Sequence, residues 1–138
     1  MFIPEKSLYD NAKRREVNGE MVVVLGSKRD RRGLSLVIPI SRALLRNEIH
    51  ELILTDEQEA GPGKKVDRIA YIGFFEVKLG GIVVIGDKVF TKDKAIAEIA
   101  GFDETHMPNH LNIILKANKR LSGLELNLSP ADMLTIKG

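Results

Sequence analysis

Short apolar runs, separated by glycine, proline and charged turns, recur along most of this chain. Within each run the apolar residues are continuous or alternate with polar ones, a spacing typical of β-strands. Many short strands with regular turns predict a mainly β protein, specifically a small closed or partly open antiparallel β-barrel with one short helix. The expected strands are residues 21–25, 34–40, 82–85, 88–90, 95–102, 110–117 and 133–136.

The short helix is expected in the segment 41–55, where the pattern is ambiguous. Ser41 is a plausible N-cap, and the apolar side chains that follow it fall on one helical face. The end of the segment, from Glu51 to Thr55, alternates like a strand. The sequence therefore predicts a turn of helix that runs into a strand.

A chain of 138 residues is long enough for one domain with a single core and short for two. Residues 1–20 are polar and lack a clear period, which predicts an N-terminal arm. Residues 21–138 are expected to form the single barrel domain. Within it, residues 56–65 make the clearest loop, because Gly61, Pro62 and Gly63 interrupt any regular element.

The composition excludes several classes of protein. Cysteine is absent, so disulfides, thiolate metal sites and cysteine nucleophiles are excluded. The N-terminus is charged and no long apolar run occurs, so we expect a cytoplasmic protein without a membrane partner. A net charge of +2 and 5% aromatic residues argue against nucleic acid as a partner. A small β protein must protect its strand edges, so we expect a homo-oligomer.

From about residue 40 onward, four stretches carry a resemblance to a known family. They are ALLRNEIHELILTDEQEAGPGKKVDRIAYIG, KLGGIVVIGDKVFTKDKAIAEIAGF, DETHMPNHLNI and LSPADMLTI. In this order they resemble the glucitol/sorbitol-specific enzyme IIA family of the bacterial phosphotransferase system, over roughly 70% of the chain. The resemblance implies a closed or nearly closed small β-barrel.

The same resemblance argues against the family's activity. That family relays phosphate through a histidine on the strand after the Gly-Pro loop, and the corresponding residue here is Gly73, in AYIGFFE. A phosphohistidine relay begins with attack by an imidazole nitrogen, which glycine lacks. No catalytic residue is therefore carried over, and a shared fold alone assigns no function.

The segment Gly101–Ile113 holds the most chemically suggestive residues. Imidazole and carboxylate groups bind transition metals, and a histidine beside a carboxylate also suits proton transfer. Pro108 and Gly101 favour a loop, in which the spacing of the histidines is no evidence that they converge. The alternative is a solvated turn whose carboxylate caps backbone N–H groups. The candidate ligand-binding residues are Asp103, Glu104, His106, Asn109 and His110, with His50 as a possible further metal ligand.

A second candidate is the basic cluster Lys28, Arg29, Arg31 and Arg32, which is interrupted by Asp30. Such a cluster suits the phosphates of a nucleotide or nucleic acid. The alternative is a charged turn that serves solubility. Glycines 80, 81 and 86 resemble a phosphate loop only weakly, because no lysine-serine pair and no helix follows them.

These observations predict a non-catalytic module that binds a small metabolite or a protein and holds no cofactor. Two other functions stay open. One is a metal-assisted or acid/base enzyme that uses the Asp103–His110 loop, and the other is nucleic-acid binding through Lys28–Arg32.

Overall fold

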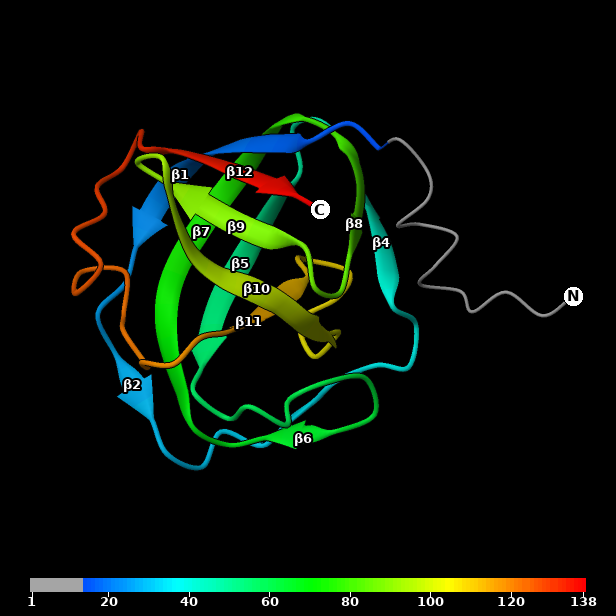
Figure 1. Ribbon diagram of the computed structural model, residues 1–138, viewed down its shortest axis with the longest axis vertical. Helices are drawn as coiled ribbons and strands as arrows, with labels where there is room; N and C mark the ends of the chain where they lie inside the picture. The colour runs from blue at the N-terminus through cyan, green and yellow to red at the C-terminus, as the bar shows by residue number, and fades with distance from the viewer. Residues whose placement is uncertain (1–13) are drawn as a thin grey trace, which may run out of the picture.

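The structure is a computed structural model that describes residues 14–138. The described chain forms twelve strands joined by turns and loops (Figure 1). The strands are β1 (Val17–Val24), β2 (Lys28–Arg29), β3 (Leu34–Ser35), β4 (Ser41–Leu44), β5 (Ile49–Thr55), β6 (Lys65–Val66), β7 (Ile69–Leu79), β8 (Gly81–Val84), β9 (Lys88–Thr91), β10 (Lys94–Asp103), β11 (Asn112–Lys116) and β12 (Met133–Lys137).

Seven of these strands close into a barrel. They pair in the order β1-β12-β9-β10-β11-β5-β7, and β7 pairs back onto β1 to complete the ring (Figure 1). The predicted β-barrel is confirmed, but one pair is not antiparallel, because β11 runs parallel to β5. A parallel pair needs a long crossover, which the chain makes between residues 56 and 111 through the five strands β6 to β10.

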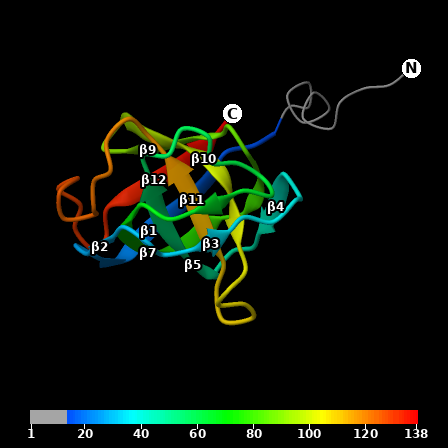
Figure 2. The same ribbon diagram turned by 90° about the horizontal axis from the view of Figure 1, so that it is seen from below.

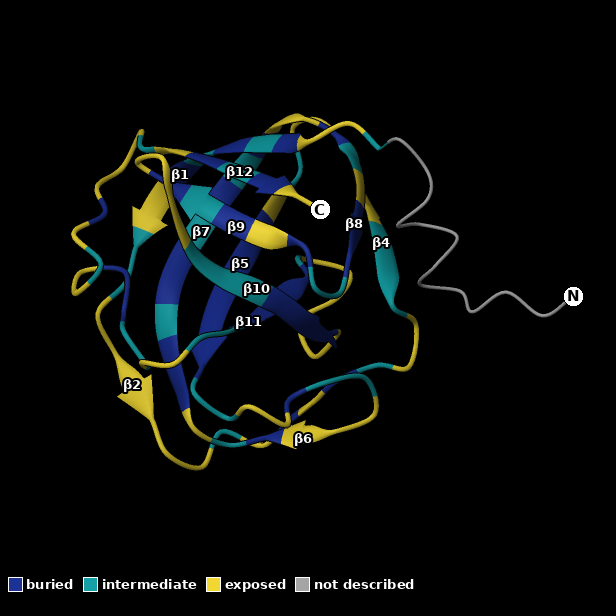
Figure 3. Ribbon diagram, in the orientation of Figure 1, coloured by how far each residue is buried: buried dark blue, intermediate teal, exposed yellow. Residues whose placement is uncertain are grey.

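The barrel encloses the main hydrophobic core. Alternate residues of its strands point inward, among them Phe75, Leu52 and Ile113. A second, smaller core lies on the opposite face of β5 and β11, where Ile53 and Ile114 pack beneath the β3–β6 pair. Because both of their faces are covered, β5 and β11 are among the most buried strands (Figure 3).

The predicted short helix is wrong, and residues 14–138 contain no helix at all. Ser41–Leu44 forms β4, which pairs with β8, and a turn that includes Asn47 at φ 76° leads into β5. The backbone amide of Leu45 donates to Glu48 Oε1 over 2.7 Å within this turn. The apolar residues that suggested one helical face are instead divided between two strands with different partners, which is a tertiary preference that local spacing does not contain.

The other expected elements have mixed outcomes. The strands expected at 95–102, 110–117 and 133–136 are confirmed as β10, β11 and β12. The strands on either side of Gly86 also exist, but β8 and β9 do not pair with each other, since β8 pairs with β4 and β9 with β10 and β12. The strand expected at 34–40 shrinks to the two residues of β3.

The expected N-terminal arm is too long, because β1 already begins at Val17. Residues 1–13 of that arm lie outside the described part of the chain. The predicted loop at 56–65 is confirmed up to its last residue, since Lys65 begins β6. Residues 14–138 hold no helix of the length and apolarity needed to cross a bilayer.

Candidate functional site

The segment expected to carry chemistry is a loop, as predicted, between the end of β10 and the start of β11 (Figure 2). At its base the rings of His106 and His110 lie side by side, with their centroids 5.1 Å apart. His110 Nδ1 lies 2.7 Å from Asn109 Oδ1, so the Nδ1–H donates to that amide oxygen. The structure therefore brings together three of the five predicted residues.

The two predicted carboxylates face other partners. Asp103 is buried and accepts hydrogen bonds from Thr105 N, Thr105 Oγ1 and Asn112 Nδ2, each over 3.0 Å. Glu104 pairs instead with Arg42 over 2.6 Å at the surface. Asp103 thus caps the turn, which is the structural alternative that the sequence had left open for it.

A third carboxylate, which sequence reasoning missed, meets the histidines. Glu51 lies on β5, and its Oε1 is 3.5 Å from His110 Nε2. It is only 6% exposed, and this burial raises its pKa to about 7, an effect that the positive charge of Arg32 partly opposes. Only the parallel pairing of β5 with β11, a contact between distant parts of the chain, brings Glu51 to the loop.

His110 is held in a largely apolar position. Its ring meets the edge of Phe74 at a centroid distance of 5.0 Å. Burial lowers the pKa of His110, the nearby His106 and His50 lower it further, and a hydrogen bond with the side chain of Asn112 acts in the opposite direction. The lowered pKa favours the uncharged imidazole at neutral pH, and its Nε2 lies toward Glu51.

His50 also reaches this loop, as the sequence suggested without being able to place it. Its Nδ1 accepts a hydrogen bond from the backbone amide of Leu111 over 3.0 Å, and its Nε2 lies 3.1 Å from Glu48 Oε1. Both ring nitrogens are thus occupied by structural contacts. No three histidine, aspartate or glutamate side chains within residues 14–138 converge as a metal site.

The basic cluster at Lys28–Arg32 contacts its neighbours through Lys28, Asp30 and its backbone, whereas the side chains of Arg29, Arg31 and Arg32 form no ion pair within the described residues. Lys28 pairs with Glu125 over 2.6 Å. Arg120 comes from a distant loop, pairs with Asp30 over 2.8 Å and also donates to the carbonyl of Arg29. Arg120 thereby lowers the pKa of the Asp30 carboxyl and binds the turn to its neighbours. Lys28 and Asp30 thus have structural contacts, and anion binding by Arg29, Arg31 and Arg32 stays a prediction.

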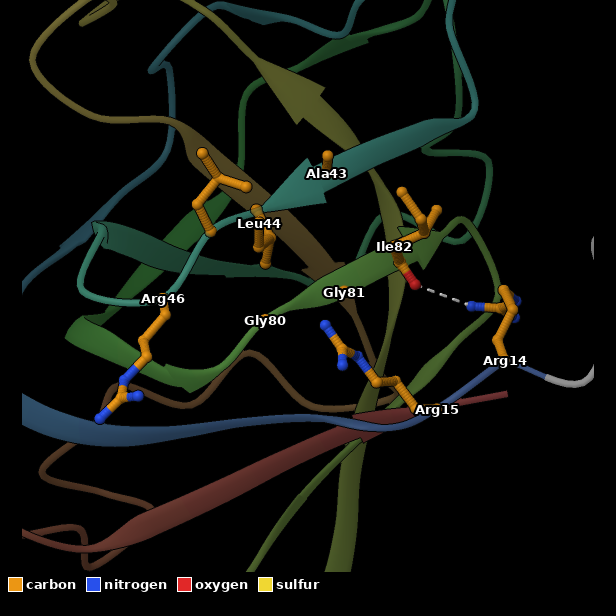
Figure 4. Close-up of a pocket in the computed structure, with 9 residues that line it drawn as sticks. Arg14, Arg15, Ala43, Leu44, Arg46, Gly80, Gly81 and Ile82 are labelled. Atoms are coloured by element: carbon orange, nitrogen blue, oxygen red, sulfur yellow. Dashed lines mark hydrogen bonds between the residues drawn. The ribbon is translucent and has the colours of Figure 1, made fainter.

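A different group of arginines lines a cavity of about 420 Å³, which we call the arginine pocket (Figure 4). Arg15 reaches it from the segment before β1 and Arg46 from the turn between β4 and β5. The remaining lining is mostly apolar or backbone. Its nine residues are Arg14, Arg15, Ala43, Leu44, Leu45, Arg46, Gly80, Gly81 and Ile82.

Two consecutive glycines shape the wall of this pocket. A Cβ atom at Gly80 would lie 2.5 Å from the carbonyl oxygen of Leu44, so only glycine allows the chain to pass so close to β4. A Cβ at Gly81 would lie 3.5 Å from Arg15 Nε. The Arg15 side chain extends toward this bare backbone, as Figure 4 shows.

The three arginines of the pocket differ in their partners. Arg14 donates to both oxygens of the buried Asp87 over 2.8 Å and to the carbonyl of Ile82 over 3.1 Å. Arg15 and Arg46 are exposed, and neither forms an ion pair within the described residues. The pocket therefore carries two guanidinium groups that are not neutralised there.

The fold of residues 14–138 defines a β-barrel protein. A model of DUF6917, a family of unknown function, matches residues 11–137, so the chain belongs to that family. No curated protein and no solved structure matches it. The resemblance to the glucitol/sorbitol-specific enzyme IIA family thus stays a prediction.

Proposed function

We propose that this protein is a non-catalytic module that binds a small organic anion in the arginine pocket. One observation carries the proposal: two arginines without ion pairs in the described chain stand at a largely apolar cavity of about 420 Å³. Ligand sites are typically cavities of roughly 300–1,000 Å³ with apolar walls and a few convergent polar groups. The arginine pocket has these properties.

The lining also supports binding rather than catalysis. Arginine keeps its proton at any physiological pH, and the other lining side chains are those of alanine, leucine, isoleucine and glycine. None of these groups is a nucleophile or a general base. A ligand in this pocket would meet recognition groups only.

The position at which the relay histidine is missing also supports a non-catalytic role. Gly73 lies on β7 at φ 149°, and a Cβ atom there would lie 2.0 Å from the carbonyl oxygen of Val23. An imidazole side chain cannot occupy that position without moving β1 away from β7. We therefore infer that phosphocarrier chemistry is absent from this strand.

Guanidinium groups select the chemistry of the ligand. Arginine binds carboxylate and phosphate groups through paired, charge-assisted hydrogen bonds. Leu44, Leu45 and Ile82 would cover an apolar portion of the same molecule. The proposed ligand class is therefore a small amphipathic carboxylate or phosphate ester.

Thermal unfolding with simple probes tests this proposal. Hexanoate and hexyl phosphate share an apolar chain and differ in the anion, whereas hexylamine reverses the charge. We expect at least one of the two anions to raise Tm in a concentration-dependent way, because a ligand that binds only the folded state stabilises it. Hexylamine should leave Tm unchanged. A protein that neither anion stabilises would contradict the proposal.

Matched double variants locate the binding. Arg15→Met with Arg46→Met should weaken binding of the anion at least about tenfold, since a charge-assisted hydrogen bond contributes roughly 1.5–3 kcal/mol. Arg29→Met with Arg31→Met removes the same charge from the basic cluster and should leave the affinity unchanged. Loss of binding in the second variant alone would place the anion on the basic cluster instead.

A protein partner and a homo-oligomer, both expected from the sequence, stay predictions. Closure of the barrel between β1 and β7 leaves the barrel itself without a free sheet edge, whereas the two-stranded β3–β6 and β4–β8 sheets keep theirs, so the homo-oligomer stays a prediction. A protein partner is likewise not indicated by any particular surface. Sedimentation of the purified chain would determine its oligomeric state directly.

A further inference from the structure

The outer edge of strand β8 supplies main-chain groups to the arginine pocket. Where the β4–β8 pair ends, Ile85 N donates to the carbonyl of Ile40 over 2.9 Å. Bonded pairs recur at every second residue of an antiparallel ladder, so the pair of Ala43 with Ile82 is not bonded. The N–H and C=O of Ile82 therefore point away from β4, and on that edge the C=O accepts from Arg14 Nη1 over 3.1 Å.

The backbone N–H of Ile82 is available to a ligand. It has no hydrogen-bond partner within the described chain, whereas the N–H of Val84, the next residue that faces this edge, donates to Asp87 Oδ2 over 2.9 Å. The backbone N–H of Arg46 also lacks a partner among the described residues, and it lies beside Gly80, where a Cβ atom would be 3.1 Å from Arg46 N. The pocket thus offers main-chain donors as well as guanidinium groups.

The charged side chains that line the pocket are all positive. Asp87 lies at the same strand, but Arg14 engages both of its oxygens over 2.8 Å. The last residue of the chain, Gly138, also lies beside Arg14, since a Cβ there would be 3.0 Å from Arg14 Nη2. The charges of Arg15 and Arg46 are therefore left for a ligand.

This donor set suits a phosphate group better than a carboxylate. A carboxylate has two oxygens in one plane, which a single guanidinium group satisfies. A phosphate monoester has three terminal oxygens and a charge of about −1.5 to −2 at neutral pH, so it accepts from two guanidinium groups and a main-chain N–H together. We propose that the ligand of the arginine pocket is a soluble phosphate monoester with a short apolar part, an inference that rests on the proposed function of this pocket.

Two glycines give the phosphate access to the main chain. A Cβ atom at Gly81 would lie 3.5 Å from Arg15 Nε, so a side chain there would occupy the space between Arg15 and the strand. Figure 4 shows Arg15 extended toward Gly81, and Arg46 on the side of Gly80. The guanidinium groups and the N–H of Ile82 thus border a wall of bare backbone, which an anion approaches closely.

The apolar part of the ligand would lie against Leu45 and Ile82. Both side chains line the pocket, and they are 63% and 39% exposed although they are apolar. Ala43 lies opposite Ile82 in the β4–β8 pair, so its methyl group is on the same face of this small sheet. Covering that face with a hydrocarbon chain favours binding.

Calorimetric titration of the purified full-length chain with three hexyl compounds tests the inference. At about pH 7.5 we expect hexyl phosphate to bind at least about tenfold more tightly than hexanoate, because it forms an additional charge-assisted hydrogen bond. Its affinity should fall about fivefold toward about pH 5, since its second charge is lost near pH 6 and arginine does not titrate in this range. Hexyl sulfate keeps a single charge throughout and should show no such fall.

Two substitutions of Ile82 test the main-chain donor. Ile82→Pro removes an N–H that does not pair with β4, and sheet edges tolerate proline where the N–H faces outward. Ile82→Ala keeps the N–H and removes apolar surface, so it should weaken hexyl phosphate and hexanoate to the same degree. Ile82→Pro should weaken hexyl phosphate at least about fivefold more than Ile82→Ala does. Circular dichroism verifies that each variant is folded, and if the proline variant is not, the three compounds still decide with the unchanged protein.

The outcomes separate this inference from the proposed function. Binding of hexanoate as tight as that of hexyl phosphate, or an affinity for hexyl phosphate that does not change with pH, would overturn the inference and leave a small-anion site in place. Absence of binding by both compounds would overturn the inference and the proposed function together. Binding to phosphatidate-containing vesicles without binding to hexyl phosphate would contradict a soluble ligand.

Discussion

His50 on β5 accepts a hydrogen bond at Nδ1 from the backbone amide of Leu111, the residue immediately before β11, over 3.0 Å. Because Nδ1 accepts, the proton of a neutral His50 is on Nε2, which faces Glu48 Oε1 at 3.1 Å. The backbone amide of Glu51 donates in turn to the carbonyl of Leu111 over 3.0 Å. These contacts set the register of the parallel β5–β11 pair and so bring Glu51 beside His110.

Replacement of His50 tests the importance of this contact. His50→Ala leaves the buried amide of Leu111 without an acceptor and opens a cavity beside Phe75, so it should lower the free energy of unfolding by about 3 kcal/mol. His50→Asn retains an oxygen near the position of Nδ1 and should recover about 1 kcal/mol of that loss. Urea unfolding of both variants measures the difference. Equal stability of the two would show that the hydrogen bond contributes nothing.

Gly73 should not tolerate any side chain. An alanine Cβ there would lie 2.0 Å from the carbonyl oxygen of Val23, at a φ of 149° that residues with side chains rarely adopt. We expect Gly73→Ala to destabilise the protein by about 3 kcal/mol or more, measured as a fall in Tm. Gly61→Ala is the matched control, since its Cβ would meet nothing closer than Glu59 O at 3.9 Å. That variant should change stability by less than about 0.5 kcal/mol.

The fold class was predictable from the sequence because strand periodicity is a local property. Leu111, Ile113 and Leu115 alternate as expected, and all three point into the barrel. Which strands pair with each other was harder to predict from the sequence. Nothing near Gly86 reveals that β8 and β9 have different partners, and the parallel β5–β11 contact joins residues about sixty positions apart.

Part of the candidate site was also predictable, because some of its residues are close together in the sequence. His106, Asn109 and His110 are close in sequence and stay close in space. Glu51 was hidden because it looked like one polar position in an alternating strand, and only its burial by distant residues makes it unusual. Arg15 and Arg46 carried no local signal either, since they line the pocket from separate segments of the chain.

Two arginine–aspartate pairs of equal length should differ sharply in their contribution to stability. Arg14 meets Asp87 and Arg120 meets Asp30, each over 2.8 Å, but the Asp87 side chain is 4% exposed and that of Asp30 is 74% exposed. Asp87→Ala also removes the acceptor of the Val84 amide and should cost about 3–5 kcal/mol. Asp30→Ala should cost far less, because solvent screens an exposed ion pair.

Chemical denaturation of the two aspartate variants in parallel checks this contrast. Repeating the measurement at high salt separates the two pairs further, because exposed charges are screened and buried ones much less so. The effect of Asp30→Ala should shrink with salt, and that of Asp87→Ala should persist. Similar losses in both variants would mean that burial of Asp87 adds nothing to its pair with Arg14.

Glu51 should make the stability of the protein fall as pH rises from about 5 to 8. In the folded state burial raises the pKa of Glu51 to about 7, whereas in the unfolded chain it titrates near 4.5. Between these values the folded state binds more protons than the unfolded state, so the free energy of unfolding decreases with increasing pH. A shift of this size corresponds to at most about 3 kcal/mol, reached only above the folded-state pKa.

Comparison with Glu51→Gln isolates this contribution from the rest of the protein. Glutamine cannot ionise, so its stability relative to the unchanged chain should improve steadily from pH 5 to pH 8. The lowered pKa of His110 acts in the opposite direction at the acidic end, since the unfolded state then binds the extra proton, and it is present in both proteins. Parallel stability curves for the two proteins would show that Glu51 ionises as easily in the barrel as in the unfolded chain.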